Sequence, residues 1–381
     1  MRSQIWCVRT SERETRIPAG IENEGYFSHL SMLAQRIIYG GLALAVILLL
    51  FLTDIRIAQI ARESSWPLAG LFERGSIIPL GTAAFLALGA LEMNRIFRFR
   101  GLAPHATFAV IMVLATTLAP WLSAGGLLGD GPAQVEGFLN IILVLAATVV
   151  GAGVLCVLGG SPDGALGNIA ATLAIVFYVG FLGSFAIHLR CGRDVPDDQG
   201  AWLLLISIFV IKASDIGAFF AGTALGRHKL SPAISPAKTV EGMTGGIMVS
   251  ALVAVGIMYF GTVADAVLAE QPTAQAAGQA AASDTTDMSL LWLAKDATLC
   301  FRFEQYPGEA FKFWLAALFG ITLAIFAQIG DLLESCFKRD AHIKDSGHVM
   351  PRFGGILDLI DSPLVALPVA WYLLVALYGV V

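Results

Sequence analysis

The chain has 381 residues, of which 56% are hydrophobic and only 14% are charged, and its formal net charge is −5. About a quarter of the residues in a soluble domain are charged, so this composition excludes an ordinary soluble domain. The small negative charge gives no basis for a nucleic-acid partner, and we expect none. The five cysteines are scattered and form no CxxC pair, which argues against a disulfide framework or a zinc site.

The first 33 residues are polar and contain several arginines. No apolar segment follows until about residue 37, so this part of the chain does not have the organisation of a signal peptide. We interpret residues 1–33 as a polar cytoplasmic segment.

Apolar runs long enough to cross a bilayer, about 20 residues each, recur from there onward. They predict an all-α, polytopic integral membrane protein with about nine transmembrane helices. The predicted spans are residues 35–53, 75–93, 106–124, 136–158, 165–188, 202–222, 244–266, 313–333 and 362–380.

The polar residues divide these spans into two regions. We predict an N-terminal transmembrane region over residues 34–198 and a C-terminal catalytic region over residues 199–381. Three long connections are expected as loops: a mixed-charge segment at 54–74, a basic Ser/Pro segment at 223–243, and an insertion at 267–312 with an Ala/Gln-rich stretch.

Lysines and arginines set the expected orientation. With the N-terminus in the cytoplasm, the cytoplasmic segments hold roughly twice as many of them as the opposite side. Both motif-bearing polar segments then face the cytoplasm, where nucleotides are. We expect a bacterial inner (plasma) membrane protein with its active site on that side.

The first polar cluster lies within the sixth predicted span, at Lys212 and Asp215. An ionisable residue within a span is costly to bury, so it is a functional candidate. Residues three apart share a helix face, so the two can pair. The alternative interpretation is a purely structural ion pair.

The second cluster is the basic Ser/Pro segment from Gly226 to Gly242. Its prolines hold the chain extended and permit a helix to start near Val240. Thr239 or Ser235 could cap that helix, and a helix N-terminus beside a lysine attracts anions. The alternative is contact with lipid head groups at the membrane surface.

The third cluster, over residues 328–362, is the richest in polar groups. Four of its residues recur at helical spacing and share one face: Gln328, Asp331, Ser335 and Lys338. Asp358 and Asp361 follow at the mouth of the last span, so carboxylates from two span ends can converge among cations. Oxygen ligands of this kind suit Mg²⁺, which takes one or two carboxylates plus phosphate oxygens. Gly354 and Gly355 would let the backbone approach a ligand.

These residues resemble the phosphatidate cytidylyltransferase family, whose C-terminal signature has the form S-x-x-K-R-x4-K-D-x-G-x3-P-x-H-G-G-x2-D-R-x-D. The matching residues are Ser335, Lys338, Arg339, Lys344, Asp345, Gly347, Pro351, Gly354, Gly355, Asp358 and Asp361. Segments 215–222 and 235–242 look like a second conserved region. Two positions depart from the signature, since Phe353 replaces its histidine and Leu359 its last arginine. The resemblance covers residues 200–381.

The resemblance implies transfer of a cytidylyl group from CTP to phosphatidate, giving CDP-diacylglycerol and pyrophosphate in phospholipid biosynthesis. It also implies Mg²⁺ as cofactor and a homodimer in the lipid bilayer. We predict that the catalytic residues are Asp331, Asp358, Asp361, Lys238 and Lys344. The predicted metal ligands are Asp331, Asp358, Asp361 and Asp215. The predicted substrate-binding residues are Ser235, Thr239, Lys229, Lys338, Arg339, Arg352, Gly354 and Gly355.

Two other functions stay open on the sequence. A CTP-dependent polyprenol or lipid kinase would share the donor and the membrane setting, but it would release CDP instead of pyrophosphate. A cation-coupled transporter would use the intramembrane charges Lys212, Asp215 and Asp331. The absence of inverted repeats and the position of the polar groups at one face argue against the transporter.

Overall fold

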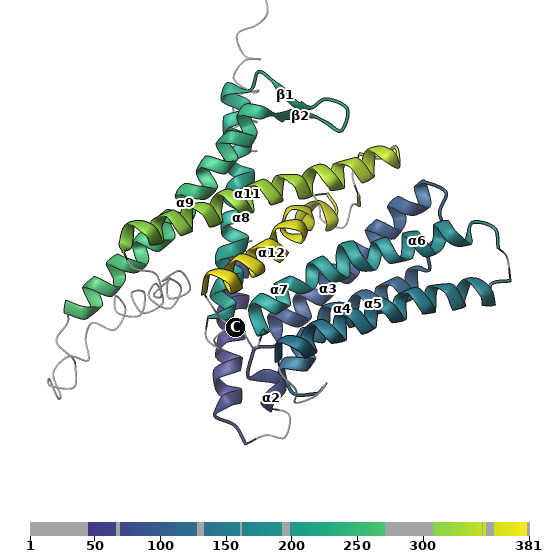
Figure 1. The fold of residues 1–381 in the computed structure, drawn as a ribbon, viewed down its shortest axis with the longest axis horizontal. Helices are drawn as coiled ribbons and strands as arrows, with labels where there is room; N and C mark the ends of the chain where they lie inside the picture. The colour runs from purple at the N-terminus through teal and green to yellow at the C-terminus, as the bar shows by residue number, and fades with distance from the viewer. Residues whose placement is uncertain are drawn as a thin grey trace, which may run out of the picture. The chain divides into compact units, whose positions relative to one another are not determined.

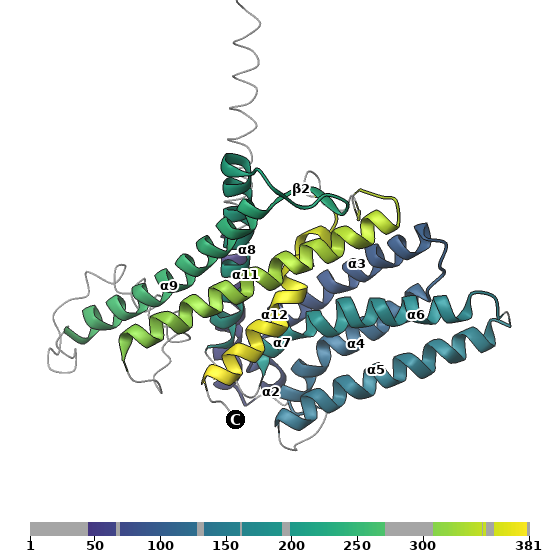
Figure 2. The same cartoon turned by 45° about the horizontal axis from the view of Figure 1, so that its top comes forward.

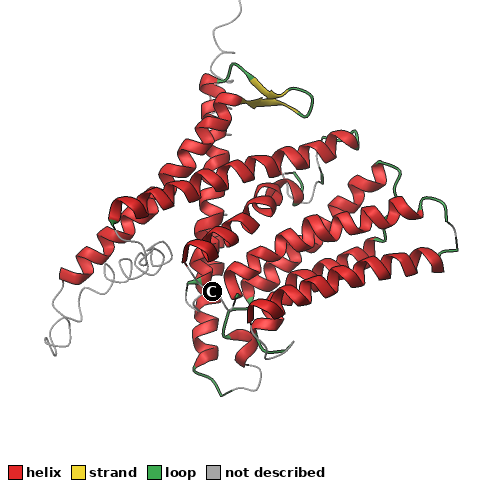
Figure 3. Cartoon of the chain, in the orientation of Figure 1, coloured by secondary structure: helices red, strands yellow, loops and turns green. Residues whose placement is uncertain are grey.

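The computed structural model describes residues 45–65, 69–127, 133–160, 162–192, 199–270, 308–344, 346–347 and 354–378. Contacts divide the chain into two units, residues 1–50 and residues 51–381. Residues 45–50 of the first unit are helical, and the elements discussed below belong to the second unit. Within the described ranges the fold is helical apart from one two-stranded hairpin (Figure 3).

The second unit starts with a helix over residues 51–62. The elements that follow are α2 (Ala69–Phe72), α3 (Ile77–Phe99), α4 (Ala106–Ala124), α5 (Ala133–Leu158), α6 (Ala165–Ile175), the π-helical η1 (Val176–Phe181), α7 (Leu182–Cys191), α8 (Gly200–Leu225), β1 (Lys229–Ser231), β2 (Ser235–Thr239), α9 (Val240–Glu270), α11 (Glu309–Asp340) and α12 (Leu357–Tyr378) (Figure 1).

Eight helical segments in the described ranges are long and apolar enough to cross a membrane. They are Ile77–Phe99, Ala106–Ala124, Leu139–Leu158, Ala165–Cys191, Gly200–Leu225, Val240–Val263, Ala310–Asp340 and Leu357–Ala376. Each coincides with a predicted span, so the prediction of an all-α integral membrane protein is confirmed for these segments. The remaining predicted span, 35–53, lies partly outside the described residues.

Some helices extend further than the apolar runs predicted. Residues 54–62 are helical, so the prediction of a loop from residue 54 was wrong there. Helices α9 and α11 likewise reach into both ends of the predicted 267–312 insertion. A helix satisfies its backbone hydrogen bonds internally, so it need not end where its apolar stretch ends. Residues 1–33 and 271–307 lie outside the described part, and the predicted division at residues 198–199 stays a prediction.

Helices α3 to α7 form one packed group, in which neighbours run alongside one another (Figures 1 and 2). Their core includes Ala90, Val113 and Val179, all fully buried. Gly180 of η1 faces the backbone of Val113, so a side chain there would be crowded. Small residues let membrane helices approach closely, which replaces the hydrophobic driving force that lipid does not supply.

A second group is built on α8, which packs against α9 along small residues. A Cβ atom at Gly217 would lie 2.7 Å from the Val249 side chain, and one at Gly245 would lie 2.2 Å from Ala221. Ser250 of α9 donates hydrogen bonds to the carbonyls of Val210 and Gly320, which ties α9 to both α8 and α11. These contacts fix the helices whose ends carry the polar motifs.

Helices α11 and α12 lie side by side in both views (Figures 1 and 2). At their contact, a Cβ atom on Gly330 would lie 2.4 Å from the carbonyl oxygen of Asp361. The glycine therefore permits a close approach, and it brings Asp331 next to the first turn of α12.

A buried ion pair holds the N-terminal end of α3. Asp54 is fully buried and pairs with Arg190 of α7 at 2.6 Å. The same carboxylate accepts hydrogen bonds from the backbone amides of Ser76, Ile77 and Ile78, at the start of α3. It therefore caps a helix that begins 23 residues later in the sequence. Sequence analysis placed Asp54 in a loop and missed this role.

Candidate active site

The polar motifs gather where α8 and α11 end and where α9 and α12 begin. Arg339 of α11 donates a hydrogen bond of 3.2 Å to the carbonyl of Ile234, between the two strands. Asp340 forms an ion pair of 2.8 Å with Arg100, just after α3. The C-terminal end of α11 therefore contacts both the hairpin and the N-terminal helical group.

The basic Ser/Pro segment forms an antiparallel hairpin, in which Lys229 pairs with Thr239 and Ser231 with Ser235. Sequence analysis expected an extended loop, because strands this short show no alternating pattern. The predicted helix start at Val240 is confirmed. So is the predicted cap, since Thr239 Oγ1 accepts a hydrogen bond from the Gly242 amide at 3.1 Å.

One ion pair joins the hairpin to α11, and a second lies within α8. Lys238 of β2 contacts Asp331 of α11 at 2.7 Å, with 22% and 37% of their side chains exposed. Lys212 and Asp215, which sequence analysis expected to pair, do so at 3.0 Å. All four side chains are partly exposed, so a bound ligand could compete for their charges.

Asp361, on the first turns of α12, has a different environment. It is almost fully buried, and its Oδ1 accepts a hydrogen bond of 2.6 Å from the Ser362 amide. Among the described residues it forms no ion pair of its own, so a carboxylate is buried there without a cation in direct contact.

Lys338 forms a buried network with two carboxylates. Its Nζ contacts Glu334, one turn earlier on α11 and fully buried, and Asp358 Oδ1 of α12 at 2.6 Å. The second oxygen of Asp358 accepts hydrogen bonds from the Gly355 amide at 2.8 Å and from Ser346 Oγ at 3.1 Å. Asp358 is therefore held through both oxygens.

Glu92 of α3 extends this network from the N-terminal half of the chain. It is buried, and it accepts hydrogen bonds from Ser346 Oγ at 3.0 Å and from the amides of Ile356 and Leu357 at 3.0 and 2.8 Å. Sequence analysis missed Glu92, although it is a lone acid within an apolar span. The rule that singled out Lys212 would have found it.

The two glycines of the signature are needed for contacts within the protein. Gly354 has φ of +89°, a conformation that residues with a Cβ rarely adopt. A Cβ atom on Gly355 would lie 1.9 Å from Ser346 Oγ and 2.5 Å from a Glu92 oxygen. Their predicted role toward a ligand stays a prediction.

The remaining predicted substrate-binding residues surround these pairs. Lys229 and Lys344 are exposed, and Ser235 is half-buried in β2. Arg352 lies outside the described residues, as does Phe353. Leu359, which replaces the arginine of the signature, is 39% exposed. The catalytic, metal-binding and substrate-binding roles of all these residues stay predictions.

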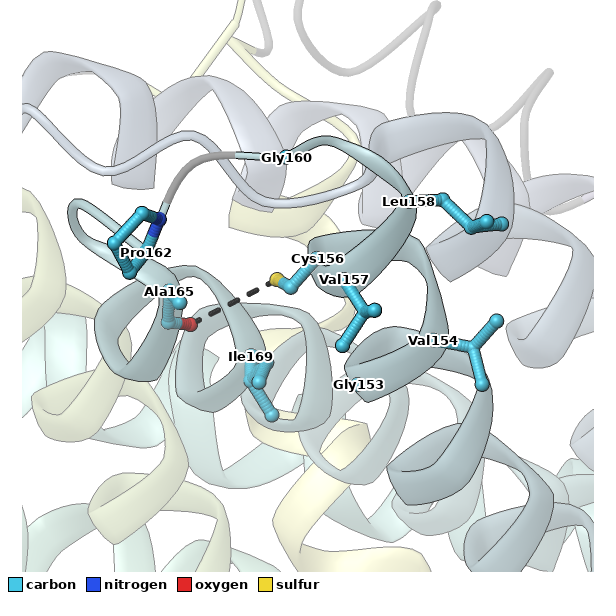
Figure 4. A pocket seen from close by; sticks show the side chains of 9 residues that line it. All are labelled: Gly153, Val154, Cys156, Val157, Leu158, Gly160, Pro162, Ala165 and Ile169. Carbon is cyan, nitrogen blue, oxygen red and sulfur yellow. Dashed lines mark hydrogen bonds between the residues drawn. The ribbon is translucent and has the colours of Figure 1, made fainter.

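A separate apolar groove of about 700 Å³ lies where α5 ends and α6 begins (Figure 4). Val157, Pro162 and Ile169 contribute to its lining, and Cys156 Sγ lies 4.0 Å from the carbonyl oxygen of Ala165. None of the predicted site residues lines it, so we do not include it in the active site.

The model of the cytidylyltransferase family matches residues 68–377, which is most of the chain. The chain belongs to this family. The matched range includes the hairpin, both ion pairs and the Glu92 network.

Curated relatives are similar over part of their length. The chain is 33% identical to a phosphatidate cytidylyltransferase of Bacillus subtilis over 203 residues, 53% of this chain and 56% of the relative. It is 33% identical to one of Staphylococcus haemolyticus over 177 residues (46% and 50%) and 30% identical to one of Staphylococcus aureus over 207 residues (54% and 59%). The matched part thus spans about half the length of these relatives.

Proposed function

We propose that the protein transfers a cytidylyl group from CTP to phosphatidate. A phosphate oxygen of phosphatidate forms a bond to the α-phosphorus of CTP. The bond from that phosphorus to the oxygen that bridges to the β-phosphorus breaks, and pyrophosphate leaves with this oxygen. The attacking phosphate monoester is already anionic at neutral pH, so the step needs no strong general base.

The observation that carries this proposal is the ion pair between the hairpin and α11, close to the contact of α11 with α12. Lys238 contacts Asp331, and the preceding Gly330 packs against the backbone carbonyl of Asp361, so a lysine and two acidic residues lie where these elements meet. Two polyanionic substrates repel each other, and cations at fixed positions would lower that repulsion. The family membership and the similarity to phosphatidate cytidylyltransferases agree with this chemistry.

The donor set suits Mg²⁺ as the cofactor. Asp361 is a buried carboxylate without an ion-pair partner among the described residues, an arrangement that is costly unless a cation compensates it. No three His, Cys, Asp or Glu side chains in the described ranges are grouped tightly enough to hold a metal by themselves. Mg²⁺ needs only one or two carboxylates when substrate phosphates and waters complete its shell. Asp331 and Asp361 would hold it, and it would neutralise charge on the phosphates.

The chain's own cations would bind and orient the substrates. Lys238 would exchange Asp331 for a phosphate oxygen of CTP; its Nζ is buried against Asp331 and has no other partner among the described residues. Arg339 and Lys344 would bind the triphosphate or the phosphatidate head group. Asp358 would contribute its negative charge from its fixed position at the start of α12. Asp215 would support the acidic side chains of the site.

We further propose that the site faces the cytoplasm and that phosphatidate enters sideways from the bilayer. The excess of lysine and arginine on that side supports the orientation. The position of the site at the ends of the helices supports lateral entry, because acyl chains can stay in the membrane. A homodimer, implied by the resemblance, remains part of the proposal.

The test is an assay of the purified chain in phosphatidate–detergent micelles with CTP, with Mg²⁺ or with EDTA. We expect CDP-diacylglycerol and pyrophosphate in equal amounts, only with Mg²⁺. Release of CDP with a phosphorylated polyprenol would show the kinase instead. A folded protein that neither binds CTP nor forms product would contradict both enzyme functions.

A further inference from the structure

We propose that Glu92 is a positioning residue, which fixes the two ends of the signature loop and, through Ser346, the carboxylate of Asp358. The described ends of this loop are residues 346–347 and 354–356, between α11 and α12. The effect on catalysis rests on the proposed function, whereas the contacts of Glu92 do not depend on it.

Glu92 joins parts of the chain that are far apart in sequence. Its Oε1 accepts a hydrogen bond from the Ile356 amide, and its Oε2 accepts hydrogen bonds from the Leu357 amide and Ser346 Oγ. Ser346 is 254 residues away in the sequence. One side chain on α3 therefore holds the residue that enters the loop and the two residues that lead out of it.

The contacts require a carboxylate of this length. Both of its oxygens accept a backbone N–H, and a glutamine would have to point its own N–H groups at one of them. An aspartate would be shorter by one methylene and could not reach both loop ends. No arginine or lysine forms an ion pair with Glu92 among the described residues, so its hydrogen bonds are what compensate its burial.

The loop backbone is shaped to receive Glu92. A Cβ atom on Gly347 would lie 2.3 Å from Glu92 Oε1, and one on Gly355 would lie 2.5 Å from Oε2. Both glycines belong to the signature, one on each side of the loop. The absence of their side chains leaves room for this carboxylate, which an incidental contact would not require.

Ser346 connects Glu92 to Asp358. Its hydroxyl oxygen lies 3.0 Å from Glu92 Oε2 and 3.1 Å from Asp358 Oδ2, so the hydroxyl can donate its one proton to either carboxylate. Loss of Glu92 would free the serine and the start of α12 together. Asp358 would then keep Lys338 but lose the fixed position of the helix that carries it.

The first test measures hydrogen–deuterium exchange of the full chain in detergent, for the wild type and for Glu92→Gln. We expect at least one of the amides of Ile356 and Leu357 to exchange at least about tenfold faster in the variant, because glutamine keeps only one of the two acceptor oxygens. Peptides from α4 should be unchanged, which shows that the protein is folded. Asp340→Asn, an exposed acid in an ion pair at the same end, is the matched control and should leave these amides protected.

The second test separates positioning from a general loss of folded protein. In Glu92→Gln we expect kcat to fall about a hundredfold and half-saturation by Mg²⁺ to move to a higher concentration, while the KM for CTP changes less than threefold. A smaller folded fraction would lower kcat without moving half-saturation. Ser346→Ala should show a weaker form of the same shift, and its effect should not add to that of Glu92→Gln.

Unchanged exchange at Ile356 and Leu357 in Glu92→Gln would overturn the inference. So would faster exchange with normal kcat and normal Mg²⁺ dependence. If Glu92→Gln does not fold, additive effects of Ser346→Ala with Asp358→Asn would overturn it instead. Failure of the proposed function itself would be visible earlier, because the wild type would then form no CDP-diacylglycerol while its exchange data stayed interpretable.

Discussion

The site contains two sets of acidic side chains, Asp331 with Asp361 and Asp358 with Glu334 and Glu92. The two sets differ in how their charges are paired. Asp331 is partly exposed and contacts Lys238, whereas Asp361 is almost fully buried and forms no ion pair among the described residues. Asp358, Glu334 and Glu92 instead lie in a buried network, in which Asp358 uses both oxygens. A partly exposed side chain such as that of Asp331 can exchange its partner for a substrate or a metal, whereas the buried carboxylates hold the geometry of the loop. We therefore expect ligands to exchange on the hairpin side of the site and the signature loop to stay rigid.

The largest effect on turnover should come from removing the charge of Asp331, on the hairpin side of the site. Asp331→Asn keeps the shape of the side chain but removes the anion, so we expect turnover to fall at least about a thousandfold. The melting temperature in detergent should change little, because the side chain is partly exposed. Near-normal turnover would remove Asp331 from the proposed metal site.

Removing the cation of the buried network should instead affect stability. Lys338→Met would leave Glu334 and Asp358 buried without their cation, which should cost about 3–5 kcal/mol of stability. Thermal unfolding in detergent would measure this, with the exposed Lys344→Met as the matched control. A melting temperature equal to that of the control would show that the network does not stabilise the fold.

A smaller and different effect is expected for Lys238. Lys238→Ala should lower kcat/KM about 10- to 100-fold, mainly through a higher KM for CTP, because the lysine is proposed to bind phosphate. Stability should change by no more than about 1 kcal/mol, since partly exposed ion pairs contribute little. Steady-state kinetics with varied CTP would measure kcat and KM separately. A normal KM with reduced kcat would show that Lys238 has a role other than binding.

The smallest effect is expected at the rim of the site. Arg100 and Asp340 pair at 2.8 Å, but more than half of each side chain is exposed. Arg100→Ala should therefore change stability by less than about 1 kcal/mol and leave turnover within twofold. A larger loss of turnover, measured in the same micelle assay, would extend the active site to the end of α3.

The sequence by itself determined what depends on neighbours along the chain. Apolar runs located the membrane helices, because a span must satisfy its backbone internally. Residues three apart on one helix predicted the Lys212–Asp215 pair, and the Ser/Pro segment predicted a helix cap at Thr239 or Ser235, of which Thr239 forms the bond. Each of these follows from local geometry.

Only the tertiary structure decided which distant residues meet. Glu92 reaches the signature loop because α3 packs against α12, and Asp331 meets Lys238 because the hairpin folds back over α11. Asp54 caps α3 and pairs with Arg190 in the same way, across segments that sequence analysis treated separately. Helix packing fixes such contacts through shape and small residues spread over several helices, and no single segment of sequence contains that information.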